Sequence, residues 1–148
     1  MELKSGIKYE SLKKGNYDKQ INQIIKKYFD GCKIYNGKYG EQKTDERFIF
    51  FRGQSKFRWR LKPSINRGKY NESQILEQII IEHPEVEKDK IIAYGQHYGF
   101  PTRAIDFTSD LKTALYFACA ENYYDDGALY ICSYTPHQND WISSLTVN

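Results

Sequence analysis

The stretch RFIFFRG (47–53), in which four consecutive apolar residues precede an arginine and a glycine, constrains the fold of this chain most strongly. A short β-rich apolar run that ends at a glycine predicts a buried strand. Helical patterns lie before and after it, so that strands and helices alternate along the chain without an internal repeat. This alternation predicts an α+β fold of one globular unit, with a small mixed or antiparallel sheet flanked by helices.

Residues 1–46 are predicted to form an N-terminal helical segment followed by a loop. Apolar side chains recur at helical spacing between Asn16 and Asp30, with Asn16 as the candidate cap and Gly31 as the expected stop. The glycine-rich polar stretch that follows predicts a loop with a short strand at 33–35. Residues 47–148 are predicted to form the main part of the globular unit.

This main part contains five further patterns after the first strand. In chain order they predict an extended segment or strand at 57–64, helices at 71–83 and 84–95 with Asn71 as the cap of the first, a helix after the loop 95–107 with Thr108 or Ser109 as its cap, and a buried strand at 127–135. The two helices at 71–95 meet at Pro84 and resemble a helical hairpin or one kinked unit.

The length of 148 residues suits one hydrophobic core of moderate size. The longest apolar runs fall far short of the roughly 20 residues that span a bilayer, and the first residues contain no apolar signal segment. Three cysteines at wide spacing suit neither a disulfide framework nor a CxxC metal site, and we expect buried thiols. We therefore expect a soluble, cytoplasmic protein with no membrane partner.

Positive charge is concentrated in residues 43–69. The net charge of the chain is +3, whereas this segment holds nine lysine and arginine residues against two acidic ones. The nine are Lys43, Arg47, Arg52, Lys56, Arg58, Arg60, Lys62, Arg67 and Lys69. Such asymmetry indicates an anionic partner such as phosphate, nucleotide or nucleic acid, although a basic run is often only a solvated surface.

Arg52 ends the apolar strand, and Gly53 after it is expected to let a ligand approach the backbone closely. The guanidinium group suits phosphate or carboxylate, which it can hold with two hydrogen bonds. The alternative is a structural salt bridge, for which Asp106 is the candidate partner. Both can hold together, because a buried Arg–Asp pair often borders a pocket.

The stretch GQHYGFPTR (95–103) belongs to the densest polar cluster in the chain. Its glycines and proline restrict the backbone, while Gln96, His97, Thr102 and Arg103 supply hydrogen bonds of every kind. His97 is a candidate general base or a donor to a ligand oxygen; the alternative is a structural histidine. No cysteine or acidic residue lies at metal-ligand spacing from it, so no metal is predicted.

Five of these side chains are expected to form one contiguous pocket where the end of the strand meets the glycine-rich loop. They are Arg52, Gln96, His97, Arg103 and Asp106. Beside them, Thr108 and Ser109 precede a helix start, where backbone N–H groups and the helix dipole favour an anion. The alternative is that they only cap the helix.

Three motifs in order resemble those of the FRG domain family, which is named for its Phe-Arg-Gly. They are FFRGQS (50–55), WRLKPSINR (59–67) and YGQHYGFPTRAIDFTSDLKTALYFA (94–118). The resemblance covers roughly residues 45–135. It implies an α+β domain of bacterial or phage origin, often linked to mobile elements and defence loci, but it does not define a reaction.

A second similarity is to ADP-ribosyltransferases of the Arg/Ser-Thr-Ser/Glu type, in which an Arg-Gly ends a first strand and a Thr-Ser block opens a later strand–helix unit. Arg52–Gly53 and FTSDLKTALYFA (107–118) match those places. The analogy implies NAD as cofactor, with its diphosphate on Arg52. The other residues expected to bind the cofactor are Gly53, Gln54, Tyr98 or Phe107 for stacking, Thr102, and Thr108 or Ser109 for the nicotinamide ribose.

This type of transferase also needs a glutamate on a late strand, which holds the ribose and stabilises an oxocarbenium-like transition state. No glutamate occurs after Glu121. Either Asp140 or His97 substitutes for it, or the chain binds a nucleotide without turning it over.

Three functions are consistent with these patterns. The first is an NAD-dependent ADP-ribosyltransferase or NAD glycohydrolase in bacterial or phage defence or toxin systems, with a protein or nucleic-acid acceptor. The second is a non-catalytic module that binds a phosphorylated nucleotide signal. The third is a nucleic-acid-binding protein that uses the 43–69 segment, with Phe57 and Trp59 stacking on bases. The first two rank above the third, because the polar cluster at 95–109 is not mainly basic.

Overall fold

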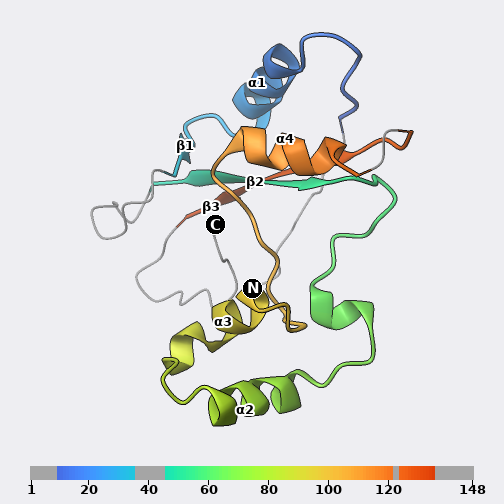
Figure 1. The fold of residues 1–148 in the computed structure, drawn as a ribbon. Coiled ribbons are helices and arrows are strands. Elements are labelled where there is room, and N and C mark those ends of the chain that lie inside the picture. The colour runs from blue at the N-terminus through green and yellow to red at the C-terminus, as the bar shows by residue number, and fades with distance from the viewer. Residues whose placement is uncertain (1–9, 36–45, 122–123, 136–148) are drawn as a thin grey trace, which may run out of the picture. The chain divides into compact units, whose positions relative to one another are not determined.

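A computed structural model describes residues 10–35, 46–121 and 124–135 (Figure 1). The elements are α1 (Tyr17–Tyr28), β1 (Lys33–Ile34), β2 (Phe48–Gln54), the 3-10 helix η1 (Ser64–Arg67), α2 (Glu72–Glu82), the 3-10 helix η2 (Lys88–Lys90), α3 (Ile91–His97), α4 (Leu111–Cys119) and β3 (Ala128–Tyr134). The chain divides into two compact units, Met1–Cys32 and Lys33–Asn148. No helix in the described ranges is long and apolar enough to cross a lipid bilayer.

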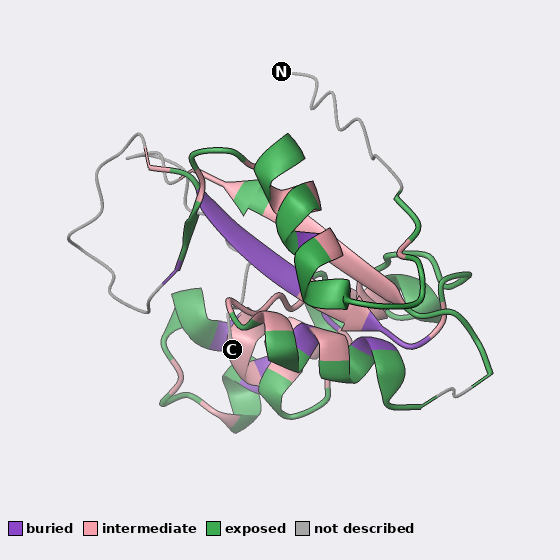
Figure 2. Ribbon diagram, turned by 90° about the horizontal axis from the view of Figure 1, so that it is seen from above, coloured by how far each residue is buried: buried purple, intermediate pink, exposed green. Residues whose placement is uncertain are grey.

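The sheet belongs to the second unit and has the strand order β1-β2-β3. β1 runs parallel to β2 and pairs Lys33 with Phe48. β3 runs antiparallel to the whole of β2, from Phe48 opposite Tyr134 to Gln54 opposite Ala128. The four apolar residues of β2 are all buried, as predicted for this run (Figure 2). The sheet is therefore mixed, and together with the helices it confirms the predicted α+β class.

Helix α4 covers one face of the sheet, and glycines let its backbone lie directly on the strands (Figure 1). A β-carbon at Gly53 would lie 1.7 Å from the carbonyl oxygen of Ala114, and one at Gly127 would lie 2.1 Å from that of Ala118. Side chains alternate across a strand, so Arg52 projects from the opposite face of β2. Gly53 therefore serves helix packing, whereas we had predicted close approach of a ligand.

The face of the sheet opposite α4 carries an aromatic core. Tyr35, Phe48 and Phe50 are buried there, and the rings of Tyr35 and Phe48 meet edge to face with centroids 5.8 Å apart. The partly buried residues that pack against this cluster are Phe107, Cys132 and Tyr134. Arg52 is the next residue of β2 on the same face. A guanidinium group thus stands at the end of an apolar row.

Helix α2 begins after Asn71, as predicted, and the Asn71 side chain accepts hydrogen bonds from two backbone N–H groups of the first turn. The prediction of a second helix that begins at Pro84 is wrong. Proline has no N–H with which to extend α2, and the chain turns there instead, with the N–H of Val86 donating to the carbonyl of His83 at 3.1 Å. Helix α3 begins only at Ile91.

Helix α3 also continues past the glycine where we expected it to end. Gly95 lies inside the helix because it packs against α2: a β-carbon there would lie 2.9 Å from Cδ1 of Ile79. The helix ends at His97, and Gly99 follows with a φ of +80°, a conformation that favours glycine. Gln96 and His97 therefore lie in a helix and not in the predicted loop.

Segment 57–64 contains no strand, contrary to one of the two predicted conformations. Gln54, the last residue of β2, turns the chain, since its side-chain amide donates to the carbonyls of Lys56 at 3.2 Å and Trp59 at 2.7 Å. Both edges of β2 are also already paired, one with β3 and the other with β1 and Thr108. The pairing with β3 runs along the whole of β2, so the segment cannot add to that edge.

The cap of α4 is Asp110, not Thr108 or Ser109 as predicted. The Asp110 carboxylate accepts hydrogen bonds from two backbone N–H groups of the first turn, at 3.1 and 3.2 Å. The backbone of Thr108 is instead paired with Phe51 through two hydrogen bonds of 2.7 Å each. Thr108 therefore belongs to the edge of the sheet, and the cap of α4 lies one residue after Ser109 and two after Thr108.

Candidate anion-binding site

A pocket of about 230 Å³ lies beside Arg52. Its walls come from β2, the segment that enters and forms η1, the last turn of α3, and the loop after α3. The polar lining residues are Arg52, Lys62, Ser64, Arg67, Gln96 and Asp106, and the others are Gly99, Phe100, Ala104 and Ile105. The fold thus brings three segments that are distant in sequence to one hollow.

Arg52 is held at this pocket by a main-chain contact. Its Nη1 donates to the carbonyl oxygen of Asp106 at 2.8 Å. Within the described residues it makes no ion pair with the Asp106 carboxylate, so the predicted salt bridge is replaced by a bond to the backbone. Burial lowers the pKa of Arg52; the charge of Asp106 opposes this shift, and the charge of Arg67 adds to it. The guanidinium therefore remains a cation whose charge is only partly compensated.

Two polar atoms at the pocket are buried without a hydrogen-bond partner among the described residues: Nε of Arg52 and Oδ1 of Asp106. Such atoms are costly, and most buried polar groups in proteins are paired. Both belong to side chains that line the hollow. A ligand or water in the pocket can satisfy them.

Two further cations border the pocket, Lys62 and Arg67. Arg67 curls back so that Nε and Nη2 donate to the carbonyl of Lys62, at 3.3 and 3.1 Å. Neither side chain forms an ion pair within the described ranges. The lining therefore holds three basic groups against the single carboxylate of Asp106, an excess that favours an anion.

Gln96 presents its amide to the pocket from the last turn of α3. Its Oε1 accepts a hydrogen bond from the hydroxyl of Thr102 at 3.1 Å, which leaves the NH₂ group as the pocket-side donor. Thr102 itself is fully buried, and its backbone N–H and carbonyl both bond to the Ser64 hydroxyl, at 2.9 and 3.2 Å. Thr102 thus fixes two lining residues, Ser64 and Gln96, and is not itself part of the pocket lining, although we had expected it to bind the cofactor.

His97 and Tyr98 lie outside the pocket lining. Both are exposed, and their rings meet edge to face with centroids 5.0 Å apart. Tyr98 also lies against Tyr94, with centroids 4.5 Å apart. The predicted convergence of the Arg52 guanidinium and the His97 imidazole on one hollow is therefore not observed.

Arg103 also lies outside the lining. Its backbone N–H donates to Oε1 of Glu72 at 2.9 Å, and its Nε lies 3.3 Å from Oε2 of the same carboxylate. These two contacts join the loop to the start of α2. Of the five side chains predicted to share one pocket, the structure brings together Arg52, Gln96 and Asp106.

Gln54 and Ser109 are not part of the lining either. Gln54 is buried, and its amide is used to form the turn after β2. Thr108 lies next to the site through its pairing with Phe51, and its hydroxyl accepts from the N–H of Asp110 at 3.0 Å. Asp140, the suggested substitute for the missing glutamate, lies outside the described residues, as does Lys43 of the basic segment.

The structure adds pocket residues that we had not assigned to the site, chiefly Lys62, Ser64 and Arg67. Lys62 and Arg67 belong to the basic segment, so their charge was the available signal. Their position depends on the turn at Gln54, which local sequence patterns did not predict.

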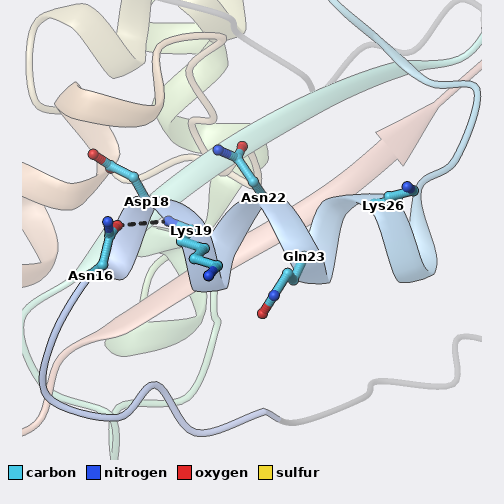
Figure 3. A pocket seen from close by; sticks show the side chains of 6 residues that line it. All are labelled: Asn16, Asp18, Lys19, Asn22, Gln23 and Lys26. Atoms are coloured by element: carbon cyan, nitrogen blue, oxygen red, sulfur yellow. Dashed lines mark hydrogen bonds between the residues drawn. The ribbon is translucent and has the colours of Figure 1, made fainter.

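A second hollow lies along α1 and is lined by residues of that helix and its cap alone, Asn16, Asp18, Lys19, Asn22, Gln23 and Lys26. Figure 3 shows their side chains leaving the helix in different directions, with Asn16 capping the N–H of Lys19. They do not converge on a point, so this hollow is the polar surface of a helix and not a site.

Within the described ranges, no group of three or more His, Cys, Asp or Glu side chains is arranged to hold a metal ion. Among known proteins, the family model described as the FRG domain matches residues 47–127. No curated protein and no solved structure matches the chain. The matched range contains every residue that lines the pocket beside Arg52.

Proposed function

This chain belongs to the FRG domain family, and on that premise we propose that its pocket binds the phosphate groups of a nucleotide. Arg52 is the principal ligand-binding residue, assisted by Lys62, Arg67 and the amide of Gln96. The observation that carries the proposal is the state of Arg52, which is half-buried, donates to a main-chain carbonyl, and forms no ion pair within the described residues, while its Nε has no hydrogen-bond partner there.

The charge distribution supports a phosphate in preference to a neutral ligand. Three cations and one carboxylate line the hollow. Arginine binds phosphate with paired hydrogen bonds, and the free Nε of Arg52 is one of the atoms that such a bidentate contact uses. Partial burial strengthens the interaction, because fewer waters screen the charges.

The size of the pocket bears on how much of the ligand it holds. Its volume of about 230 Å³ lies below the range of roughly 300–1,000 Å³ typical of sites that enclose a whole small molecule. The pocket therefore suits a diphosphate and an adjoining sugar, while the rest of a nucleotide extends over the neighbouring surface.

Isothermal titration calorimetry with ADP-ribose, NAD, ADP and inorganic pyrophosphate tests the proposal. We expect binding of the diphosphates, and a loss of at least about tenfold in affinity for Arg52→Ala, since charge-assisted hydrogen bonds contribute about 1.5–3 kcal/mol. Arg103→Ala is the matched control, because Arg103 is an arginine of the loop after α3 and lies outside the pocket lining. Equal losses in both variants, or no binding by the wild-type chain, would reject the proposal.

A second candidate function is ADP-ribosyl transfer or NAD hydrolysis. It is favoured by the pairing of Phe51 with Thr108, because the two segments that match the transferase motifs are thereby neighbours. In such a reaction the bond between nicotinamide and ribose breaks, and an oxygen or nitrogen atom of the acceptor, or the oxygen of water, forms a new bond to the ribose carbon. Nicotinamide leaves with the bonding electrons.

Nicotinamide release from NAD, measured by chromatography, tests this second function. Asp106 is the carboxylate of the pocket lining, so Asp106→Asn separates the two functions. It abolishes release if Asp106 stabilises the positive charge on the ribose, while diphosphate binding persists. A toxin or defence role, which the family resemblance implies, then follows from depletion of cellular NAD.

A further inference from the structure

Residues 57–62, FRWRLK, form an exposed strip in which apolar and basic side chains alternate. Phe57 is 57% exposed and Trp59 is 49% exposed. Leu61 is exposed as well. Large aromatic side chains are usually mostly buried, and their exposure beside cations is typical of a binding surface.

The backbone of this strip is held in place by residues outside it. The carbonyl of Trp59 accepts hydrogen bonds from the amide of Gln54 at 2.7 Å and from the hydroxyl of Tyr130 at 3.5 Å. The N–H of Phe57 donates to the carbonyl of Asp126 at 2.6 Å. The aromatic side chains are therefore presented outward from an ordered turn.

The charges of the strip are not neutralised within the described residues. Arg58, Arg60 and Lys62 are exposed and form no ion pair with any described side chain. The nearby Asp125 is already paired with Lys56 at 3.6 Å, and the Lys56 ammonium lies 5.7 Å from the centre of the Trp59 ring. The surface thus combines net positive charge with exposed rings.

The strip leads into the pocket beside Arg52. Lys62 is the last residue of the strip and also lines the pocket. There the Nε of Arg67 donates a hydrogen bond to the Lys62 carbonyl. A ligand that lies along the strip can therefore place a phosphate group in the pocket without crossing an acidic side chain of the strip.

We infer that this strip docks single-stranded nucleic acid, with bases stacked on Phe57 and Trp59, backbone phosphates on Arg58 and Arg60, and a phosphate of the strand in the Arg52 pocket. Stacking on exposed rings requires unpaired bases, which excludes an intact duplex. The inference rests on the proposed function, because it identifies the phosphate that the pocket takes as part of a polynucleotide.

Fluorescence anisotropy of a short labelled single-stranded oligonucleotide at low salt tests the inference. Trp59→Ala is expected to weaken binding at least about tenfold, since one stacked base contributes about 1–3 kcal/mol. Tyr116→Ala is the matched control, because Tyr116 is an exposed aromatic residue on α4, outside the strip. Charge is tested with Arg58→Glu, and Lys112→Glu on α4 is its control. Only Arg58→Glu should weaken oligonucleotide binding.

A direct readout of stacking comes from Trp59 fluorescence. The chain has two tryptophans, Trp59 and Trp141, so Trp141→Phe leaves Trp59 as the sole emitter. Oligonucleotide should quench this emission, whereas inorganic polyphosphate, which has charge but no bases, should not. Equal quenching by polyphosphate, or equal effects of Trp59→Ala and Tyr116→Ala, overturns the inference.

The same variants separate this inference from the proposed function. Trp59→Ala should retain calorimetric binding of inorganic pyrophosphate, while Arg52→Ala should lose it and also weaken oligonucleotide binding. A wild-type chain that binds pyrophosphate but no oligonucleotide at low salt refutes the docking surface and leaves the pocket standing. A chain that binds neither refutes both.

Discussion

The guanidinium of Arg52 donates to the main-chain carbonyl of Asp106 at 2.8 Å and, within the described residues, forms no ion pair with the Asp106 carboxylate. This geometry keeps the charge of Arg52 available. A bidentate salt bridge would use the same donors that a phosphate needs. The main-chain bond positions the arginine and leaves its Nε free.

Replacement of Asp106 by asparagine should strengthen diphosphate binding. The variant removes the one carboxylate of the pocket lining, while the main-chain carbonyl that holds Arg52 remains. We expect affinity for inorganic pyrophosphate to rise about fivefold, the effect of removing one repulsive charge in a partly exposed site. Calorimetry measures it, and a weaker affinity would mean that the Asp106 carboxylate supports the site and does not repel the ligand.

Affinity for NAD should be nearly constant between about pH 6.5 and pH 9. Burial lowers the pKa of Arg52, but arginine stays protonated throughout this range. His97, the predicted general base, lies outside the pocket lining, so we expect no contribution from it to the pH dependence of binding. A pH dependence of binding within this range that disappears in His97→Ala would instead place the histidine in the site.

Gly53→Ala should destabilise the domain by about 3 kcal/mol, near the upper end of ordinary overpacking costs. The new β-carbon would lie 1.7 Å from the carbonyl oxygen of Ala114, and because this is a backbone atom, the strand and the helix would have to shift apart. Gly99→Ala is the comparison: it has open space but a φ of +80°, and should cost about 1 kcal/mol. Urea denaturation measures both. Equal costs would show that backbone conformation matters at both positions and packing at neither.

Cys132 should resist alkylation in the folded protein, whereas Cys119 should react. Burial raises the pKa of the Cys132 thiol to about 11, partly offset by a hydrogen bond with the Phe50 backbone. At pH 8 only about one molecule in a thousand then carries the reactive thiolate. Cys119 is exposed. Mass spectrometry after iodoacetamide treatment tests this, and unfolding in urea should make the two cysteines react alike.

Because the folded Cys132 thiol has the raised pKa, the free energy of unfolding should decline above about pH 9, where the unfolded thiol ionises.

Local patterns along the chain were sufficient for the strand at 48–54, the strand at 128–134, and the caps at Asn16 and Asn71. Each depends on residues close in sequence: a short β-rich apolar run, or a side chain that bonds to the first turn of the helix that it caps. The FRG motifs were recognisable for the same reason, since each is a short contiguous stretch.

The candidate site was predicted in part. Arg52, Gln96 and Asp106 meet at the pocket, but His97 does not, because α3 continues two residues past Gly95, where we had expected it to end. Successive residues on a helix point about 100° apart, so when Gln96 faces the pocket its neighbour His97 faces elsewhere. In the extended loop that we had expected, the two side chains had no such constraint.

Amino-acid order alone established the α+β class, the family and the basic character of residues 43–69, because these depend on local spacing and on composition. Tertiary packing decided which charges share the pocket. The backbone of α4 packs directly against Gly53, and the turn at Gln54 directs Lys62 and Arg67 toward Arg52. Contacts between residues far apart in the chain set these positions, and no local pattern encodes such contacts.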